Sequence, residues 1–195
     1  MTECANVNCV DVNSPFAIVD FSNLILEQLS SSIENHQDLV ILCIGTDRST
    51  GDSLGPLVGY KLFPYMSSYE RVHLIGTLEE PVHAKNLSDT ISMIKSRHSE
   101  ALVLAIDASL GHHNKIGYIT IKKGPLKPGL GVNKKLPFIG DISITGVVNV
   151  GGMMEYMVLQ NTRLSLVMNM ADIISKGINR ALFKLYNDNY DEKTK

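Results

Sequence analysis

Two aspartates stand in segments of the sequence that could carry out hydrolysis. Residues 45–56 read GTDRSTGDSLGP and follow the apolar run LVILCI, so Asp52 lies in a glycine-rich loop after a strand-like segment. Asp107 ends a second apolar run, ALVLAID. Two carboxylates held close together share one proton, because like charges at short range cannot both ionise. One could then activate a water molecule while the other donates a proton. The same spacing also allows each aspartate to cap a helix.

The glycine-rich loop fits two other kinds of site less well. A phosphate-binding P-loop needs lysine and then serine or threonine after its second glycine, whereas here Asp52 follows and would repel a phosphate. The stretch GDSLG formally matches the GxSxG motif of serine hydrolases, with Asp107 and His112 following in the order of α/β-hydrolases. That motif puts its serine at the end of a strand, whereas several residues separate LVILCI from Ser53. The paired-carboxylate interpretation fits the placement best.

Alternating apolar runs and helical patterns would position these residues. Strands are expected at 39–44, 71–76, 101–107, 116–121 and 141–148, and helices from about 20 to 33, 54 to 65, 81 to 97 and 164 to 186. This alternation predicts an α/β fold of three layers, with a mixed, mostly parallel sheet flanked by helices. We expect a flexible N-terminal arm over 1–17 and a single domain over 18–195. Ligands gather at the carboxyl ends of strands in such sheets, where both aspartates stand.

Composition narrows the function classes. The chain has 195 residues, 44% of them hydrophobic and 19% charged, with a formal net charge of −2. These values are typical of a globular protein and give no sign of a membrane or nucleic-acid surface. The three cysteines include no second pair that would complete a zinc site, and the N-terminus has no signal-peptide pattern. We therefore expect a cytoplasmic protein with no cofactor.

The motifs GDSLGP and Ile106-Asp107-Ala108 together resemble those of the spore germination protease. Sporulation-associated proteases related to it share this pattern, within the superfamily that has the hydrogenase-maturation-endopeptidase fold. The resemblance runs over residues 38–185. It implies a peptidase with a phosphorylase/hydrolase-like fold, in which Asp52 and Asp107 are the catalytic pair. It also implies a peptide or small spore protein as substrate, in the cytoplasm of a spore or sporulating cell.

Other residues near the two motifs are candidates for binding substrate: Thr46, Asp47, Ser53, Glu79, Glu80 and His83. Hydrogenase-maturation enzymes hold nickel through the equivalent acidic positions and a downstream histidine. This sequence has no histidine after His113, so we expect no metal. His83 with the carboxylates leaves a metal-dependent hydrolase as an alternative, although a single histidine near a helix start is more often structural.

Two further segments leave alternatives open. Residues 115–136 contain six lysines and no acid, and read as a solvated basic loop or as a rim that attracts acidic peptides. The apolar stripe of residues 164–186 covers either the sheet or a partner subunit, so a homo-oligomer stays open. The chain could also be a sporulation factor that keeps the fold and binds in the cleft without catalysis.

Overall fold

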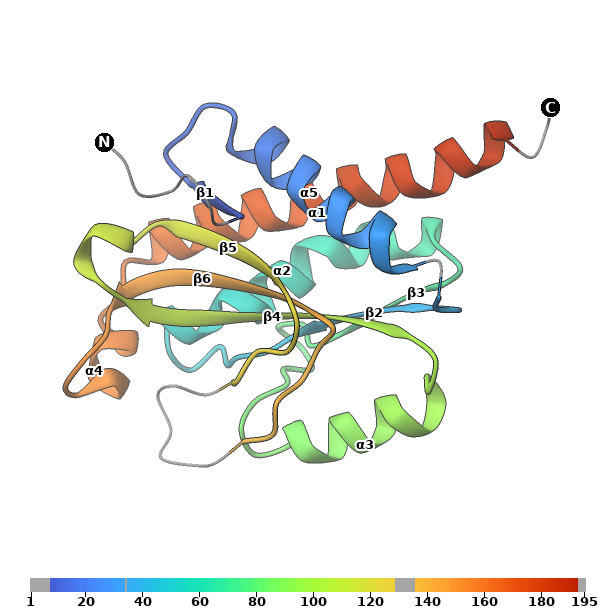
Figure 1. Cartoon of the computed structure of the whole chain (residues 1–195). Helices are drawn as coiled ribbons and strands as arrows, with labels where there is room; N and C mark the ends of the chain where they lie inside the picture. The colour runs from blue at the N-terminus through green and yellow to red at the C-terminus, as the bar shows by residue number, and fades with distance from the viewer. Residues whose placement is uncertain (1–7, 34, 129–135, 193–195) are drawn as a thin grey trace.

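The sheet has six strands and is mixed but mostly parallel. The computed structural model describes residues 8–33, 35–128 and 136–192 (Figure 1). The strands are β1 (Cys9–Asp11), β2 (Leu39–Cys43), β3 (Val72–Ile75), β4 (Leu102–Gly111), β5 (Tyr118–Lys123) and β6 (Ile142–Val150). They are ordered β1-β5-β6-β4-β2-β3. Strands β3, β2, β4 and β6 are parallel, whereas β5 is antiparallel to both β6 and β1. The expected sheet is confirmed.

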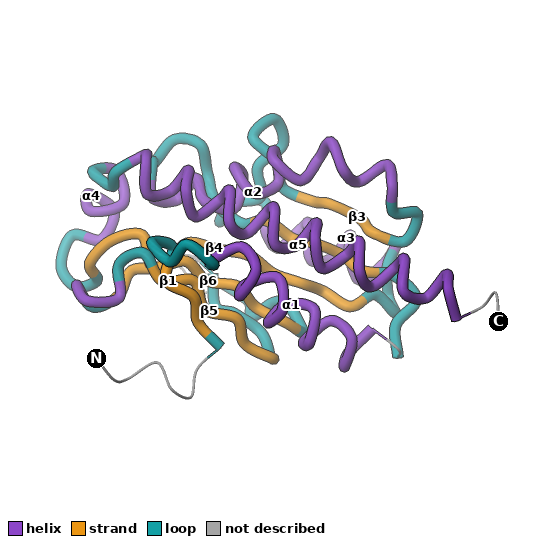
Figure 2. Tube along the Cα trace, turned by 90° about the horizontal axis from the view of Figure 1, so that it is seen from above, coloured by secondary structure: helices purple, strands orange, loops and turns teal. Residues whose placement is uncertain are grey.

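Helices cover both faces of this sheet. One layer holds α1 (Ala17–Ile33), α2 (Leu54–Leu62) and α5 (Leu164–Glu192), and the opposite layer holds α3 (Leu87–Arg97) (Figure 1). Figure 2 shows α1 and α5 running side by side across the sheet. The short helix α4 (Glu155–Gln160) lies beyond the end of β6, and 3₁₀ turns occur at 51–53, 63–68 and 113–115. The three-layer prediction is confirmed.

The central strand β2 shows why the apolar runs become strands. All five of its residues are buried. Because alternate side chains of a strand point to opposite faces, the run fills two separate cores. Leu39, Ile41 and Cys43 pack with the α1, α2 and α5 layer, whereas Val40 and Leu42 pack with α3. A strand covered on both faces reads as a continuous apolar run rather than as an alternation.

The helix expected from Pro81 begins only at Leu87. The side chain of Asn86 accepts a hydrogen bond from the backbone N–H of His83 (2.8 Å) and donates one to the carbonyl of Pro81 (3.1 Å). These bonds hold 81–86 as a loop. Of the two alternatives for the C-terminal stripe, the structure shows packing within the chain, since buried residues of α5 belong to the same core as α1. In the described part of the chain, no helix has the length and apolar character needed to cross a membrane.

The N-terminal arm expected over 1–17 is corrected for the residues that the structure describes. Residues 9–11 form β1, which pairs with β5 at the edge of the sheet, and α1 already begins at Ala17. Val10 and Val12 are buried in the main core. This edge strand was not expected because three residues are too short to show an alternating pattern. Residues 1–7 lie outside the described part of the chain.

Candidate active site

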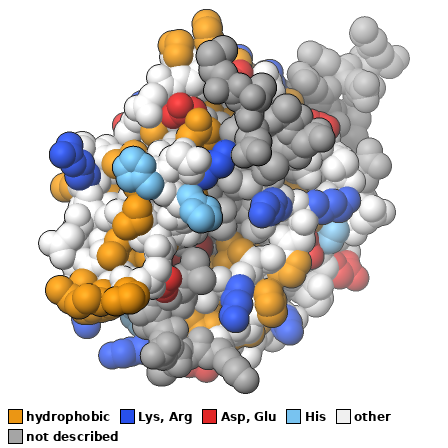
Figure 3. Space-filling model, turned by 60° about the vertical axis from the view of Figure 1, so that its left-hand side comes forward, with side chains coloured by type: hydrophobic (Ala, Val, Ile, Leu, Met, Phe, Trp, Pro, Cys, Tyr) orange, Lys and Arg blue, Asp and Glu red, His pale blue; other side chains and the backbone are white. Residues whose placement is uncertain are grey.

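A cavity of about 240 Å³ opens beyond the carboxyl end of β2, beside Asp107 of β4. Its walls combine the loop after β2, the loop before α3, one residue of β4 and the helix α4. They contain Ile44, Gly45, Thr46, Arg48, Ser49, Asp52, His83, Ala84, Lys85, Asp107, Pro128, Leu136, Tyr156 and Leu159. Figure 3 brings forward the side of the molecule that carries α4, where basic side chains lie around hydrophobic ones. The position agrees with the rule that ligands bind at the carboxyl edge of such sheets.

Asp107 is fixed by the sheet. It does not end its strand, as expected, but lies inside β4, which continues to Gly111 because β6 pairs with it beyond this point. On the other side, the pairing of β4 with β2 stops at Ile106 opposite Cys43. Asp107 therefore stands where one neighbouring strand has ended. Its side chain is buried, and Oδ1 accepts a hydrogen bond from the N–H of Ala108 at 2.8 Å.

Asp52 is brought to the same cavity by a tight turn. The N–H of Thr46 donates to the Asp52 carbonyl at 3.0 Å, so the loop folds back on itself directly after β2. Gly45 makes this approach possible, because a Cβ there would lie 2.0 Å from the Asp52 carbonyl oxygen and its φ is +143°. Asp52 then lies in the 3₁₀ turn that leads into α2. The alternative that Asp52 caps this helix is not supported, since Ser53 is the N-cap and no side-chain cap forms.

The Asp52 carboxyl lies in a poorly solvated position. Burial raises its pKa from 3.8 to about 6, and the nearby His83 partly opposes this shift. Desolvation raises the pKa of a carboxyl because it disfavours the charged form. Within the described residues, the carboxyl makes no hydrogen bond that would stabilise the charge. Asp52 therefore exchanges its proton close to neutral pH, which suits a general acid or base.

His83 is held at the cavity by the end of β2. The N–H of Gly45 donates to the carbonyl of Val82 at 2.8 Å, and Ile44 and Val82 form a parallel bridge. These contacts place the loop that carries His83 against the loop that carries Asp52. The His83 Nδ1 atom is buried and has no hydrogen-bond partner among the described residues. The His83 ring also lines the cavity, where it can meet a ligand.

The structure brings together some of the predicted site residues and separates others. Asp52, Asp107, Thr46 and His83 line one cavity. Ser53 does not line it, because its side chain is buried and its hydroxyl donates to the Thr50 carbonyl at 2.7 Å. The remaining predicted residues also lie elsewhere. Asp47 is exposed on the loop, and Glu79 and Glu80 line a larger neighbouring cavity of about 1060 Å³, which His83 also borders.

Several lining residues were not predicted from the sequence. Tyr156 and Leu159 come from α4, whose six residues are too few for a helical period to stand out. Arg48 and Lys85 add positive charge to the wall. Arg48 stands in the loop GTDRSTGDSLGP and Lys85 two residues after His83, and these positions were the available signal. The lysine-rich segment also reaches the cavity through its residues 128 and 136, while 129–135 lie outside the described residues.

The cavity residues can be tested against a metal site of the kind the fold family implies. Among the described residues, one group of three or more ligating side chains has all its ligand atoms within 4.8 Å, and it lies elsewhere, at Asp38, His73 and His98. Asp52, His83 and Asp107 do not meet this criterion together. A single ion needs ligand atoms about 2 Å from its centre. The three residues as arranged do not fit one shared ion.

Comparisons with known proteins agree with the fold. HycI, a [NiFe] hydrogenase maturation protease from Thermococcus kodakarensis KOD1, superposes with a TM-score of 0.50 and 19% identity. The match covers 80% of this chain and 98% of HycI, and it supports the expected hydrogenase maturation protease fold. The uncharacterized protein YyaC of Bacillus subtilis (strain 168) is 54% identical over 152 residues, which are 77% of this chain and 73% of YyaC. The model of the family described as "Protein of unknown function (DUF1256)" matches residues 9–177, and the chain belongs to this family.

Proposed function

We propose that this protein is a peptidase-like hydrolase in which Asp52 and Asp107 form the catalytic pair. The observation that carries the proposal is the shared cavity: both carboxyl groups line it, at the carboxyl edge of a parallel sheet. HycI is a maturation protease and shares this fold, which adds support. Fold alone does not determine function, so the argument depends on the site.

The two aspartates have different surroundings and would take different roles. Asp52, with its pKa raised to about 6 by burial, holds a proton more readily than an ordinary carboxyl and is the proton donor. Asp107 accepts a backbone N–H and is the base. Asp107 takes a proton from water as the water oxygen attacks the scissile carbonyl carbon. Asp52 then gives a proton to the leaving nitrogen as the C–N bond breaks.

The remaining cavity residues would position the substrate. The Thr46 hydroxyl and the His83 ring stand beside the pair and can hydrogen-bond to a peptide group. Arg48 and Lys85 line the cavity and would attract acidic side chains. This charge favours an acidic peptide or a small acidic spore protein. The motif resemblance to the germination protease points to the same substrate class.

The test is a hydrolysis assay on small acid-soluble spore proteins and on acidic peptides. Wild type should cleave, and Asp52→Asn and Asp107→Asn should each lower kcat by about 10²–10⁴-fold, the range of general acid–base catalysis. Asp89→Asn is the matched control, because Asp89 is exposed on α3 away from the cavity. It should keep the wild-type rate.

The outcomes separate the competing interpretations. Wild-type cleavage that persists in chelator and is lost in both aspartate variants supports the metal-free pair. Cleavage that chelator abolishes, and that His83→Ala also loses, would replace the proposal by a metal-dependent hydrolase. Folded wild-type protein that binds these substrates without cleaving them would replace it by a binding protein.

A further inference from the structure

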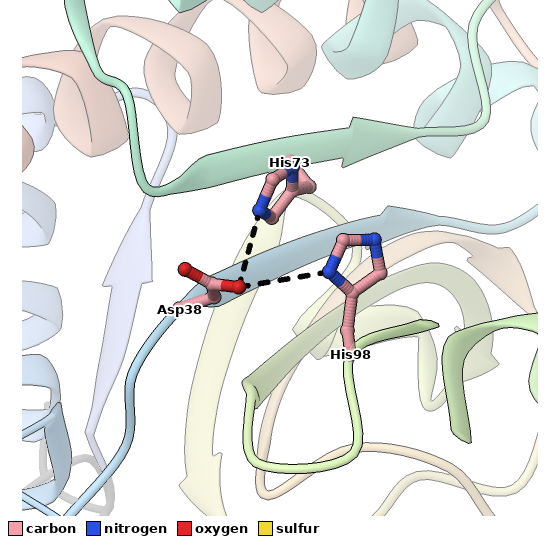
Figure 4. A group of neighbouring side chains, drawn as sticks. All are labelled: Asp38, His73 and His98. Carbon is pink, nitrogen blue, oxygen red and sulfur yellow. Dashed lines mark ion pairs between the residues drawn. The ribbon is translucent and has the colours of Figure 1, made fainter. Parts of the chain in front are cut away.

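We propose that Asp38, His73 and His98 form a Zn²⁺ site at the opposite edge of the sheet from the cavity. Asp38 directly precedes β2, His73 is in β3 and His98 directly follows α3. Figure 4 shows the three side chains pointing toward one another from these elements. Their ligand atoms all lie within 4.8 Å of one another. None of the three takes part in the proposed catalytic chemistry.

The separations between the side chains fit a metal ion better than direct hydrogen bonds. Asp38 Oδ2 lies 3.4 Å from His73 Nε2 and 3.7 Å from His98 Nδ1. An N–H···O hydrogen bond spans 2.7–3.2 Å, so both contacts are too long to be good hydrogen bonds. Ligand atoms bound to one tetrahedral zinc at 2.0–2.1 Å stand roughly 3.4 Å apart. The two separations from Asp38 are therefore close to those of zinc ligands, and the third pair of ligand atoms lies within 4.8 Å.

One member of the cluster also lacks another partner. His98 Nδ1 is buried and has no hydrogen bond among the described residues. A buried ring nitrogen without a partner is costly in a folded protein, and a metal ion would satisfy it. The His73 and His98 rings are also close, with centroids 4.1 Å apart. Two protonated rings at this distance would repel each other, whereas two neutral rings can bind one ion.

The backbone holds the three residues in register. In the parallel pair β2 and β3, Val40 stands opposite His73. Asp38 lies two residues before Val40 and so projects from the same face, the face covered by α3. The N–H of Leu102 donates to the Asp38 carbonyl at 2.9 Å, and the N–H of His98 donates to the Ile94 carbonyl at 2.8 Å. The cluster therefore has one member inside a strand, and its other two members directly adjoin β2 and α3, where backbone hydrogen bonds hold them.

The local electrostatics also favour a cation. His98 is the C-cap of α3, and the carboxyl end of a helix carries partial negative charge. The Asp38 carboxylate adds a full negative charge. The side chains of Asp38, His73 and His98 are 32%, 35% and 18% exposed, so solvent can reach the cluster. Water can therefore supply the fourth ligand that three protein ligands leave open.

Two imidazoles and one carboxylate suit Zn²⁺, a borderline ion that takes nitrogen and oxygen ligands in tetrahedral geometry. A bound ion would join the start of β2, the start of β3 and the end of α3. Because these segments are 35 and 25 residues apart in the chain, the ion would fix the α3 layer to the sheet. The proposal departs from the expectation of a metal-free protein. That expectation was based on the residues around the two aspartates and on the cysteines, and His73 and His98 were not considered as ligands.

The test is calorimetric titration of Zn²⁺ into chelator-treated full-length protein, with a thermal melt at each zinc level. Wild type should bind one Zn²⁺ through the cluster. Its Tm should rise by roughly 5–10 °C when free zinc reaches 100 times Kd. His98→Gln and His73→Gln should each weaken binding by at least about 100-fold, because even residues that only orient a ligand cost 10–100-fold. Two variants on different elements protect the test if one fails to fold, and far-UV circular dichroism checks the fold.

Two controls locate the ion. His113→Gln removes an exposed histidine outside the cluster and should keep the wild-type Kd. The double variant Asp52→Asn/His83→Gln alters the cavity and should also keep it. Zinc binding that survives in His73→Gln and His98→Gln would overturn the proposal, as would binding lost only in the cavity variant. The absence of zinc binding by folded wild-type protein at millimolar zinc would overturn it too.

Discussion

At the scale of single residues, the burial of Asp52 has a consequence for stability that is independent of catalysis. Its pKa is about 6 in the folded chain and 3.8 for an ordinary carboxyl, so the native state binds more protons between these values. The contribution of the Asp52 carboxyl to the free energy of unfolding is therefore fully present below about pH 4, and it is lost as the pH rises through about 6. At pH 7, Asp52→Asn should unfold at a higher urea concentration than wild type, and its free energy of unfolding should be larger by up to about 3 kcal/mol. This difference should disappear toward pH 4.

The same urea series with Asp89→Asn provides the comparison. Asp89 is exposed, so the free energy of unfolding of Asp89→Asn should follow that of wild type across the pH range. If Asp52→Asn also ran parallel to wild type, the Asp52 carboxyl would not be desolvated in solution, and its role as proton donor would lose its physical basis. A stabilising change that removes activity is the pattern expected of a group kept for function.

At the scale of elements, α2 sets the position of Asp52 through close backbone contacts. Gly55 faces β2, where a Cβ would lie 2.0 Å from the Ile44 carbonyl oxygen. One turn later, a Cβ on Gly59 would lie 2.0 Å from the Gly76 carbonyl oxygen at the end of β3. The clash in each case is with backbone, which cannot move aside as a flexible side chain can. Glycine at these two positions lets the helix rest directly on the strand ends.

Gly59→Ala should therefore push α2 away from the sheet. We expect the free energy of unfolding to fall by about 3 kcal/mol, the upper part of the range for overpacking, and hydrolysis to weaken because Asp52 moves with the helix. Gly151→Ala is the control, since its Cβ would meet Leu110 at an ordinary 3.5 Å. It should change stability by less than about 0.5 kcal/mol. Equal stability of the two variants in urea would contradict the close contact.

At the scale of the whole molecule, the first and last helices hold one layer together. Phe21 of α1 is fully buried against α5, where a Cβ on Gly177 would lie 2.3 Å from its ring. Phe21→Ala should lower the free energy of unfolding by about 3–5 kcal/mol, because it leaves a cavity between these helices and the sheet. Phe16→Ala removes a ring that is 66% exposed and should have little effect. If the Tm fell equally in both variants, the contact between α1 and α5 at Phe21 would not be the source of this stability.

Much of the architecture could be read from the sequence because local patterns encode it. The runs at 39–44 and 101–106 are apolar throughout, as is typical of strands buried on both faces, and they became β2 and the first half of β4. The prediction that Asp52 lies beyond the end of β2 came from the same patterns, whereas Asp107 reaches the cavity because β2 ends beside it while β4 continues. The rest of the cavity wall could not be read in this way. The position of α4 in the wall and the absence of Ser53 from it depend on how short segments turn and pack. Such segments are too short to show a hydrophobic period.

The sequence by itself determined the α/β layers and the loop position of Asp52 after a buried strand, because hydrophobic period is a local property. Only the tertiary structure decided that β1 forms an edge strand beside β5, that His83 and Asp52 line one cavity, and that Asp38, His73 and His98 meet. Each of these depends on the register between segments far apart in the chain. Register comes from the packing of the whole core, and no run of neighbouring residues records it.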